Sequence, residues 1–577
     1  MCVRKWKKPF CRCASGSHCR ISRSVRTTQN SAGNRGITVE EKHMMIPGPS
    51  ESITTTSTAV LIVGGGPVGL TVAIELARRG VPCRIIERRT TPRIGTRACT
   101  IWQRTLEVFG LMGMPMSRYL DAGVEYIHRT YHVAGFPPVC HNMSQSASRY
   151  SSALVTGQDT TERMLTERLA ELGVTVERGR TALAVRQDDV RVSTIIRDAK
   201  GRHKTIESAW LVVAEGSHSV LRDQLGITWS SRRFPGTQLL QVDAEVRGTL
   251  RGDPTHCHLF LGPHGSLGTA PLPDGRLRLY AGVADFEPTL RTDPSISELT
   301  EAIRAVTANS DLDIHHARFA WRVRLHNSAA DRFRAGRCLL VGDAAHTVIP
   351  VAAQGMNTGI QDAFNLGWKL AAVATGRATE SLLNSYATER QQVAQSVLQR
   401  TERNYWGGTG ATPDFEQLHT QLHRIGSIHT GITLAYTDSP LSHDNTIGRE
   451  PRAGQRAPDG PVEYFRGREG RLYDLLAHGD WTLLEFGCRT TWPTLPPGCR
   501  LVRIGPFDGQ DSPPMSAGID IGGSATLWRR YAAEAGAIFL IRPDTYIGYA
   551  GTADNPDDPW RYLRMVLDSG SAASLRA

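Results

Sequence analysis

Three glycines near residue 65 are spaced for binding a pyrophosphate. The run Gly64-Gly65-Gly66-Pro67-Val68-Gly69 has the form G-x-G-x-x-G and follows five apolar residues, Ala59 to Val63. In such a motif the first glycine permits a tight turn, the second lets backbone approach the phosphates, and the third lets helix and strand pack closely. Gly64, Gly66 and Gly69 are therefore predicted to bind a dinucleotide.

The elements that must position these glycines follow in order. A helix with periodic apolar residues from Leu70 to Ala77 leads to a second strand, Cys83–Ile86, and the unit ends on Glu87. The helix start offers free N–H groups and the positive end of its dipole to phosphates. Glu87 can accept hydrogen bonds from a ribose. The complete βαβ unit favours FAD because it stands near the start of the organised chain, although the motif alone leaves NAD open.

A second cluster of residues is suited to the other half of a flavin. A buried strand, Cys338–Val341, runs into Gly342-Asp343, where a carboxylate can hold a sugar-alcohol hydroxyl. A loop from Pro350 to Asn357 then enters a long helix. Its bare N–H groups suit the electron-rich N1/O2 edge of a reduced isoalloxazine.

Taken together, these motifs resemble those of the class A flavoprotein monooxygenases, typified by para-hydroxybenzoate hydroxylase. The chain looks closest to the branch with a C-terminal thioredoxin-like domain, such as phenol hydroxylase and pentachlorophenol monooxygenase. The resemblance covers roughly residues 59–570 and is most specific in 59–107, 154–226 and 318–390.

The resemblance implies a role for individual residues. Gly64, Gly66, Gly69 and Glu87 match the ADP-binding fingerprint, Arg97 the arginine that reaches the pyrophosphate, Gln158 a glutamine that touches the cofactor, and Gly342-Asp343 the ribitol-binding pair. Pro350, Gly355, Met356 and Asn357 match the loop that cups the flavin ring.

Two departures from the family pattern stand out. The family's Asp-Gly motif, linked to FAD and to the reduced pyridine nucleotide, reads Glu215-Gly216 here, and His218 replaces an arginine. The longer Glu215 side chain is expected to affect the nucleotide step. The flavin loop has Val351-Ala352-Ala353 in place of Pro-x-Gly-Gly. The extra methyl groups would narrow the space beside the ring, or be harmless if φ is negative there.

The resemblance implies an FAD-dependent enzyme that uses NADPH or NADH and O2 to hydroxylate an aromatic or phenolic small molecule through a flavin C4a-hydroperoxide. The chain has no second nucleotide fingerprint, so the nicotinamide is expected to bind transiently. Baeyer–Villiger oxidation or epoxidation on the same scaffold stays open, as does, more remotely, a non-catalytic flavin-fold binding protein.

The catalytic side chain is not identified by the sequence, since the hard chemistry belongs to the cofactor. The pocket is expected between the inserted sheet and the loop after Asp343. His258 lies on a strand where it shares a face with His256 and Phe260. It is a candidate for binding or deprotonating a phenol, although such a histidine is more often a hydrogen-bonded sheet residue.

The fold class that follows is α/β: a Rossmann-like FAD-binding domain with an inserted, mainly antiparallel substrate sheet, and a thioredoxin-like α/β domain at the C-terminus. The expected divisions are a basic, disordered leader (1–57), the FAD-binding domain (58–400) with its insertion (about 237–330), a helical connector (401–455) and the C-terminal domain (456–577). That last domain lacks C-x-x-C, because Cys488 and Cys499 lie eleven positions apart, so a structural role or a homodimer interface is expected.

The charge and cysteine content limit the choice of partners. The net charge of +11 is concentrated in the first 50 residues, which hold ten Lys or Arg and two acids. A nearly balanced body argues against nucleic-acid binding. No apolar run of membrane-spanning length and no metal-ligand constellation occur. Scattered cysteines suggest a reduced, cytoplasmic protein. The leader alternatively suggests a transit peptide, or a start at Met44 or Met45.

Overall fold

The computed structural model describes residues 21–29, 35–43, 55–95, 98–247, 255–284, 292–307, 313–350, 353–403, 415–422, 430–446, 449–464, 468–487, 490, 492, 495–505, 518–522 and 524–568. The chain divides into two compact units, Met1–Thr55 and Thr56–Ala577.

The first unit contains a strand pair. β1 (Ile21–Gln29) and β2 (Arg35–His43) pair antiparallel, with Val25 opposite Val39. The sequence analysis expects no regular structure in the leader, and the two strands differ from that expectation. Both segments are rich in β-branched residues, which favour extended backbone.

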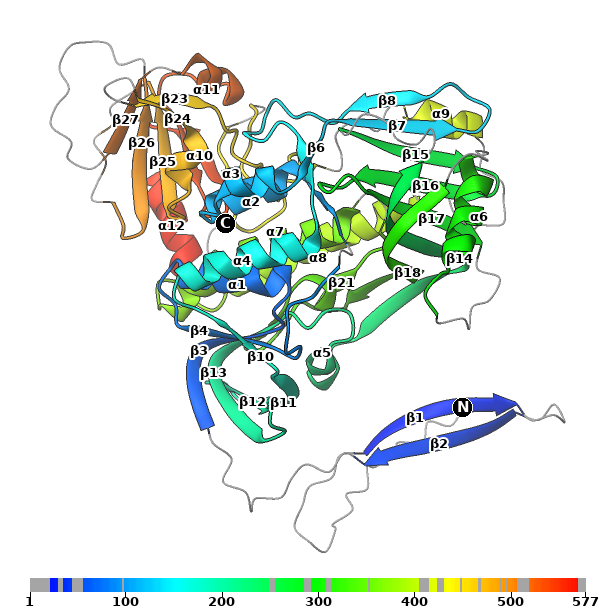
Figure 1. Ribbon diagram of the computed structural model, residues 1–577. Helices are drawn as coiled ribbons and strands as arrows, with labels where there is room; N and C mark the ends of the chain where they lie inside the picture. The colour runs from blue at the N-terminus through cyan, green and yellow to red at the C-terminus, as the bar shows by residue number, and fades with distance from the viewer. Residues whose placement is uncertain are drawn as a thin grey trace, which may run out of the picture. The chain divides into compact units, whose positions relative to one another are not determined.

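The central sheet of the second unit carries the predicted βαβ start (Figure 1). Its strand order is β10-β4-β3-β13-β12-β11, with β20 beside β13 and β19 beside β20. The strands are β3 (Thr55–Val63), β4 (Cys83–Glu87), β10 (Val176–Arg178), β11 (Thr181–Gln187), β12 (Val192–Arg197), β13 (His203–Val213), β19 (Arg334–Ala335) and β20 (Cys338–Leu340). β3, β4 and β10 are parallel, as expected for a Rossmann-like unit.

Helices cover this sheet and join it to the rest of the unit. They are α1 (Pro67–Ala77), α2 (Gln103–Leu111), α3 (Met116–Asp121), α4 (Gln158–Glu171), α5 (Val220–Gln224), α7 (Gln354–Ala374) and α8 (Leu382–Arg403). α1 packs closely on α7 because Gly367 has no side chain: a Cβ there would lie 2.3 Å from the Cβ of Glu75. The two helices that start at the predicted cofactor motifs are thus directly in contact.

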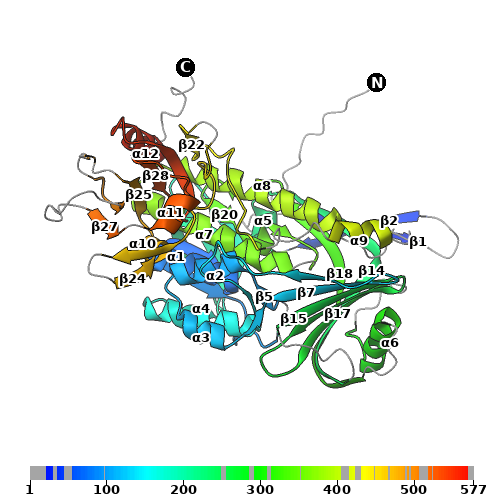
Figure 2. The same ribbon diagram turned by 90° about the horizontal axis from the view of Figure 1, so that it is seen from above.

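A second large sheet forms the predicted insertion (Figures 1 and 2). Its order is β21-β18-β14-β17-β16-β15-β7-β8, and most of its neighbours are antiparallel. The strands are β7 (His128–Val133), β8 (Val139–Asn142), β14 (Trp229–Arg247), β15 (His256–Gly262), β16 (Gly265–Pro271), β17 (Leu277–Ala284), β18 (Asp313–Ala330) and β21 (His346–Thr347). β7 and β8 come from a segment that the sequence analysis does not assign to this sheet.

One face of this substrate sheet is covered by α6 (Ile296–Thr307). Leu299 and Ile303 of the helix form a buried cluster with Leu240, Val242 and Leu279 of the sheet. Ser295 caps the start of this helix, since its Oγ accepts a hydrogen bond from the backbone N–H of Glu298 at 3.2 Å. The opposite face of the sheet is not covered by this helix.

The C-terminal segment forms a third sheet of order β22-β29-β28-β25-β26-β27-β23-β24. β25, β26 and β27 are parallel; β28 pairs antiparallel with β25, and β29 pairs antiparallel with β28. The elements are β22 (His443–Asp444), β23 (Pro461–Tyr464), β24 (Arg468–Arg471), α10 (Leu472–Leu476), β25 (Trp481–Phe486), β26 (Cys499–Ile504), β27 (Gly518–Gly522), α11 (Ala525–Arg530), β28 (Ala537–Ile541), β29 (Ile547–Thr552) and α12 (Asp558–Asp568). Cys488 lies outside the described residues.

Smaller elements complete the unit: a three-stranded sheet of β5 (Thr100–Ile101), β9 (Ala153–Val155) and β6 (Val124–Tyr126), the 3-10 turn η1 (Gly342–Ala344), and α9 (Phe415–Leu422). None of the helices in the described part of the chain is both long and apolar enough to cross a bilayer.

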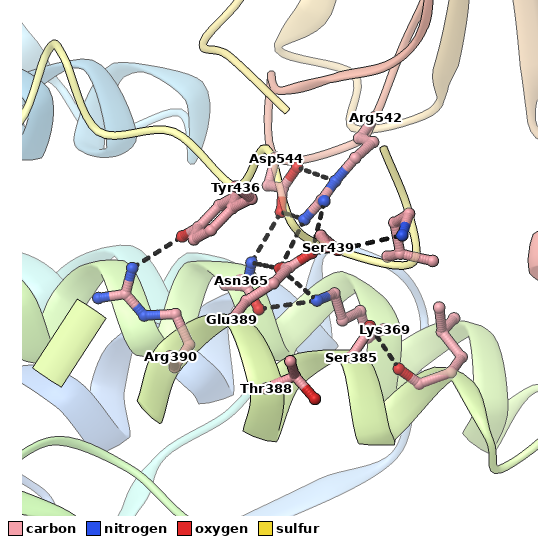
Figure 3. A network of polar contacts seen from close by, with 12 residues as sticks. Asn365, Lys369, Ser385, Thr388, Glu389, Arg390, Tyr436, Ser439, Arg542 and Asp544 are labelled. Carbon is pink, nitrogen blue, oxygen red and sulfur yellow. Dashed lines mark hydrogen bonds and ion pairs between the residues drawn. The ribbon is translucent and has the colours of Figure 1, made fainter. Parts of the chain in front are cut away.

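A buried polar network fixes the C-terminal sheet on α7 and α8 (Figure 3). Glu389 accepts hydrogen bonds from Arg542 Nη1 at 2.7 Å and from Lys369 Nζ at 2.7 Å. Asp544 pairs with Arg542 and also accepts a hydrogen bond from Asn365. Since every charge in this network is fully buried, removing one partner would leave another uncompensated. The network therefore holds the third sheet in a defined position on the helices of the cofactor region.

Candidate cofactor and substrate site

The turn after β3 has the geometry that a pyrophosphate site requires. Gly64 has φ +117°, and a Cβ on it would lie 2.1 Å from the carbonyl oxygen of Ala214. A Cβ on Gly69 would lie 2.0 Å from the carbonyl oxygen of Gly64. Around Gly66, by contrast, a Cβ would meet nothing within 4 Å, and this residue caps α1. The backbone at the helix start is thus open to a phosphate, and the predicted division of roles among the glycines fits.

Glu87 ends β4 beside this turn. One of its carboxylate oxygens accepts a hydrogen bond from Gly65 N at 2.8 Å, and the other accepts one from Arg89 N at 3.0 Å. The carboxylate is buried and held by backbone donors, which orients it before any ligand binds. Each oxygen keeps a lone pair for a ribose hydroxyl.

Glu215 follows β13 and bends back onto α5. Its carboxylate accepts hydrogen bonds from Ser219 Oγ at 2.5 Å and from Leu221 N at 3.1 Å. Burial raises the pKa of Glu215, and these two donors oppose the rise. The longer side chain thus caps the short helix of its own motif. His218 is exposed.

Gly342 and Asp343 form the 3-10 turn after β20. Gly342 has φ +58°, and a Cβ on it would lie 2.9 Å from Val68 Cγ2 at the start of α1. Asp343 is exposed next to this contact. The guanidinium of Arg222 donates to the carbonyl oxygens of Ser217 (3.1 Å) and Ala344 (3.3 Å), so the motif of Glu215 and that of Asp343 are tied together.

Asp362 of α7 anchors the same turn from inside. It accepts hydrogen bonds from Gly342 N (3.2 Å), His346 Nε2 (2.7 Å) and Arg390 Nε (2.6 Å). Burial alone would raise the pKa of Asp362, but Arg390 and His346 outweigh it and the pKa is lowered. The sequence analysis does not select Asp362 or Arg390; a buried charge on an apolar helix face is the signal that would have drawn attention to Asp362.

The flavin loop enters α7 through a strained residue. The backbone of Ala353 has φ +53° and ψ +41°. An alanine at this position is expected to be harmless only if φ is negative, and φ is positive. An L-residue in this left-handed region costs about 1–2 kcal/mol. Val351 and Ala352 lie outside the described residues.

Asn357 fixes the start of α7. Its Nδ2 donates to the carbonyl oxygens of Thr100 (2.9 Å) and Ala353 (2.8 Å), and its Oδ1 accepts from Trp102 N (3.0 Å). The side chain is 3% exposed and engaged by protein on both ends. Asn357 therefore positions the loop and β5 relative to each other.

The remaining predicted residues take varied places. Pro350 is exposed and Met356 is half-buried against the main core. A Cβ on Gly355 would make ordinary contact with Val348 at 3.7 Å. Gln158, the first residue of α4, donates to Glu162 at 2.8 Å. Arg97 lies outside the described residues.

His258 lies on the face of the substrate sheet that α6 covers. In the strand register His258 stands opposite Thr269, and Thr269 stands opposite Leu279. Leu279 packs in the buried cluster with Leu299 and Ile303 of α6, so all three strand residues share that face. Nδ1 of His258 lies 3.1 Å from His132 Nε2, and burial, His132 and His256 lower its pKa. This placement is that of a histidine in a packed sheet.

The opposite face carries larger polar and aromatic side chains that the sequence analysis does not single out. Arg278 pairs with Asp243 at 2.8 Å and lies over the ring of Trp321. Tyr280 packs with Ile349 of the segment that leads into the flavin loop. Alternation along β17, where Leu277, Leu279 and Ala281 face α6, is the signal that separates these residues from the core.

Comparisons with known proteins agree with this site. The model of the FAD binding domain family matches residues 57–401. The pentachlorophenol 4-monooxygenase of Sphingobium chlorophenolicum is 30% identical over 86% of this chain and 95% of its own length. The 6-methylpretetramide 4-monooxygenase of Streptomyces rimosus is 32% identical over 85% and 90%. The solved structure of an anhydrotetracycline hydroxylase from Streptomyces rimosus superimposes with a TM-score of 0.68 at 26% identity, covering 89% of this chain and 99% of that one.

The family matches and the geometry of the two motifs agree on the class of protein. The chain belongs to the family of FAD-binding monooxygenases. It is an FAD-dependent oxidoreductase, as the resemblance of its motifs implies.

Proposed function

We propose that this chain is a single-component monooxygenase that uses NADPH or NADH and O2 to hydroxylate an aromatic or phenolic small molecule. The observation that carries the proposal is the direct contact between the two cofactor motifs, where Val68 of α1 meets Gly342 of the ribitol turn. One flavin dinucleotide can therefore span both. The named activities of the relatives support the same reaction class.

The residues present fit FAD. Gly64, Gly66, Gly69 and Glu87 would hold the adenosine and pyrophosphate half, together with Arg97 and Gln158. Gly342 and Asp343 would hold the ribitol. The segment Pro350 to Asn357 would hold the ring at the start of α7. Bound FAD supplies the redox chemistry, taking electrons from NAD(P)H and activating O2.

The chain's own contribution is positioning and charge. The N–H groups at the start of α7 would stabilise negative charge on reduced FAD bound there. Asn357 holds that helix start in place, and Asp362 anchors the neighbouring turn of Gly342. The face of the substrate sheet opposite α6 would position the aromatic molecule and exclude water. Glu215 is proposed to act in the nucleotide step through the α5 motif.

The test is a screen of phenols for stimulation of NADPH and NADH oxidation by the FAD-loaded protein, with product mass measured. A mass gain of one oxygen atom with retention of the ring supports hydroxylation. A product with oxygen inserted into a ring C–C bond next to a carbonyl would indicate Baeyer–Villiger oxidation instead of hydroxylation. An epoxide product would indicate epoxidation. A protein that binds no flavin would contradict the proposal altogether.

We also infer the role of the C-terminal segment. Its central strands, with β25, β26 and β27 parallel and β28 and β29 antiparallel, support a thioredoxin-like domain, and the divisions 1–57, 58–400, 401–455 and 456–577 are retained as proposed domains. Cys499 is the cysteine of this domain within the described residues, and burial raises its pKa to about 12, which disfavours a reactive thiolate. A structural role or a homodimer interface is proposed.

A cytoplasmic location is proposed on the basis of the cysteines. Those in the described residues are free thiols, as expected in a reducing compartment: Cys83, Cys99, Cys140, Cys257, Cys338 and Cys499.

A further inference from the structure

One buried arginine of the substrate sheet differs from all other buried arginines that the structure describes. Six of these have a carboxylate within 4 Å: Arg104, Arg222, Arg278, Arg390, Arg456 and Arg542. Arg129 of β7 is 9% exposed, and no carboxylate of the described residues lies that close to it. A buried cation without an anion is costly, so its retention calls for a partner that is not part of the chain.

The surroundings of Arg129 are aromatic. Its guanidinium lies 5.3 Å from the ring centre of Tyr126, 5.7 Å from that of Trp102 and 6.0 Å from that of Tyr131. Burial lowers the pKa of Arg129, but interactions with Tyr126 and Tyr131, among them a hydrogen bond to the Tyr131 side chain, leave it raised well above its usual value, so the group stays charged. The Tyr126 hydroxyl is itself buried without a hydrogen-bond partner among the described residues. Arg129 has further N–H groups beyond its hydrogen bond to Tyr131, so it and the Tyr126 hydroxyl can both donate to an oxygen ligand.

The position of Arg129 places this pair at the substrate side of the flavin. Arg129 stands opposite Cys257 in the strand register, so the two side chains share a face of the sheet. Cys257 belongs to a buried cluster that contains no residue of α6, so this is the face that α6 does not cover. Trp102, whose ring Arg129 approaches, donates its backbone N–H to Asn357 of the flavin loop. Trp102 therefore connects the guanidinium of Arg129 to Asn357, which anchors the flavin-ring loop.

We propose that Arg129 binds an anionic oxygen of the aromatic substrate, and that the protein accordingly selects aromatics that are ionised at neutral pH. The ligand chemistry is an oxyanion attached to the ring system, supplied either by a carboxylate or by an acidic phenol. Trp102, Tyr126 and Tyr131 pack around the ring that carries it. This proposal rests on the proposed monooxygenase function and names the substrate class for it.

The test uses the FAD holoenzyme and two matched pairs of ligands. One pair is 2-naphthoate and its methyl ester; the other is pentachlorophenol and its methyl ether. Binding is followed by the change in the flavin absorption spectrum, without nucleotide and without turnover. The wild type should bind at least one anion about 10- to 100-fold more tightly than its neutral counterpart, as expected for a charge-assisted hydrogen bond in a buried site. Which pair shows the preference tells carboxylate from phenolate.

Three variants give the controls. Arg129→Gln should lose the preference for the anion and keep the affinity for the neutral ligand, and Arg129→Lys should retain part of the preference. Arg232→Gln removes an exposed arginine of the same sheet and should bind as the wild type does. The melting temperature of unliganded Arg129→Gln should fall only slightly, because no ion pair is broken and only contacts with the neighbouring rings are lost. A fall of many degrees together with an unchanged preference for the anion would indicate a structural role and overturn the proposal.

The proposal is overturned if the wild type shows no preference for either anion, if none of the four ligands perturbs the flavin, or if Arg129→Gln keeps the preference. These outcomes leave the monooxygenase proposal intact as long as NAD(P)H reduces the flavin and another aromatic gains an oxygen atom. If no aromatic gains an oxygen atom, the monooxygenase proposal fails, and the proposal for Arg129, which depends on it, fails as well.

Discussion

The side-chain oxygen of Asn357 accepts a hydrogen bond from the backbone N–H of Trp102 at 3.0 Å, across 255 positions of the chain. Through this contact the start of α7 is fixed to β5 and α2. Because Trp102 also faces Arg129, the same contact relates the flavin loop to the substrate sheet.

Replacing Asn357 with Ala should therefore weaken both FAD binding and the fold. The change removes the acceptor of the Trp102 N–H and a donor to the carbonyl oxygens of Thr100 and Ala353, which costs about 1–3 kcal/mol. We expect a lower melting temperature in the holoenzyme and faster loss of FAD on a desalting column. Gln361→Ala, one turn further along α7, removes a partly buried amide whose Nε2 donates to the carbonyl oxygen of Asn357 at 3.2 Å, and serves as the control. Equal effects of the two substitutions would argue against a special role for Asn357.

Asp343→Ala tests the placement of the ribitol. Removing a hydroxyl acceptor from the cofactor site should weaken FAD binding by about 1–3 kcal/mol, roughly 5- to 150-fold. The dissociation constant of FAD from the apoprotein is the measurement. Asp188→Ala, in an exposed turn far along the chain from both motifs, should leave that constant unchanged. Unchanged FAD affinity in Asp343→Ala would show that the ribitol lies elsewhere.

Ala353→Gly tests the strain at the entry to α7. Glycine adopts φ +53° freely, so the substitution should stabilise the fold by about 1 kcal/mol and raise the melting temperature. Ala353→Val should destabilise it, because a β-branched residue is disfavoured at positive φ. A lower melting temperature for the glycine variant would mean that the alanine methyl makes contacts worth more than the strain.

The sequence predicts some parts of this site well and others poorly, for physical reasons. The turn around Gly64 and the acid Glu87 are readable because strand, glycine turn, helix and second strand lie within 30 residues. The Asn357–Trp102 contact joins residues far apart in the chain, so no local pattern reports it. The alternation on β15 correctly groups His258 with His256 and Phe260, but which face α6 covers depends on tertiary packing.

Arg129 and Arg278 illustrate the same limit. Both are arginines in strands with alternating apolar residues, and the sequence does not distinguish them. Only the structure shows that Arg278 has Asp243 opposite it in the register, while Arg129 faces rings. The ion pair of Arg390 and Asp362 is similarly invisible until α7 and α8 are placed side by side.

Lys369 gives a pH dependence whose sign can be stated. Burial lowers its pKa to about 8, against the opposing effect of Glu389. Between pH 8 and about 10.5 the unfolded chain binds this proton more strongly than the folded one does. Stability contributed by this group therefore rises with pH over that window, at up to about 1.4 kcal/mol per pH unit. The free energy of unfolding of the wild type minus that of Lys369→Met should increase from pH 8 to pH 10.5. A flat or falling difference would contradict the lowered pKa.

The reduction step tests the function as a whole. A single polypeptide of this class must accept electrons from NADPH or NADH without a partner reductase. The chain has one dinucleotide fingerprint, so the nicotinamide should bind transiently and leave. Reduction should be slow in the absence of an aromatic ligand and faster with a suitable one, which requires the ligand to bind the reducible state more tightly than the resting state. Stopped-flow bleaching of the flavin band under anaerobic conditions, with each nucleotide and a panel of phenols, measures this.

Glu215 is the residue at which this step can be perturbed selectively. Its carboxylate caps α5 through Ser219 and Leu221, and an aspartate is one methylene too short to reach both donors from the same backbone position. Glu215→Asp should therefore change the rate of reduction or the apparent affinity for NAD(P)H several-fold, while FAD content stays the same. Glu207→Asp, on the preceding strand, provides the matched control. If neither nucleotide reduces the wild-type flavin under any condition, but an added flavin reductase supports turnover, the single-component proposal is wrong.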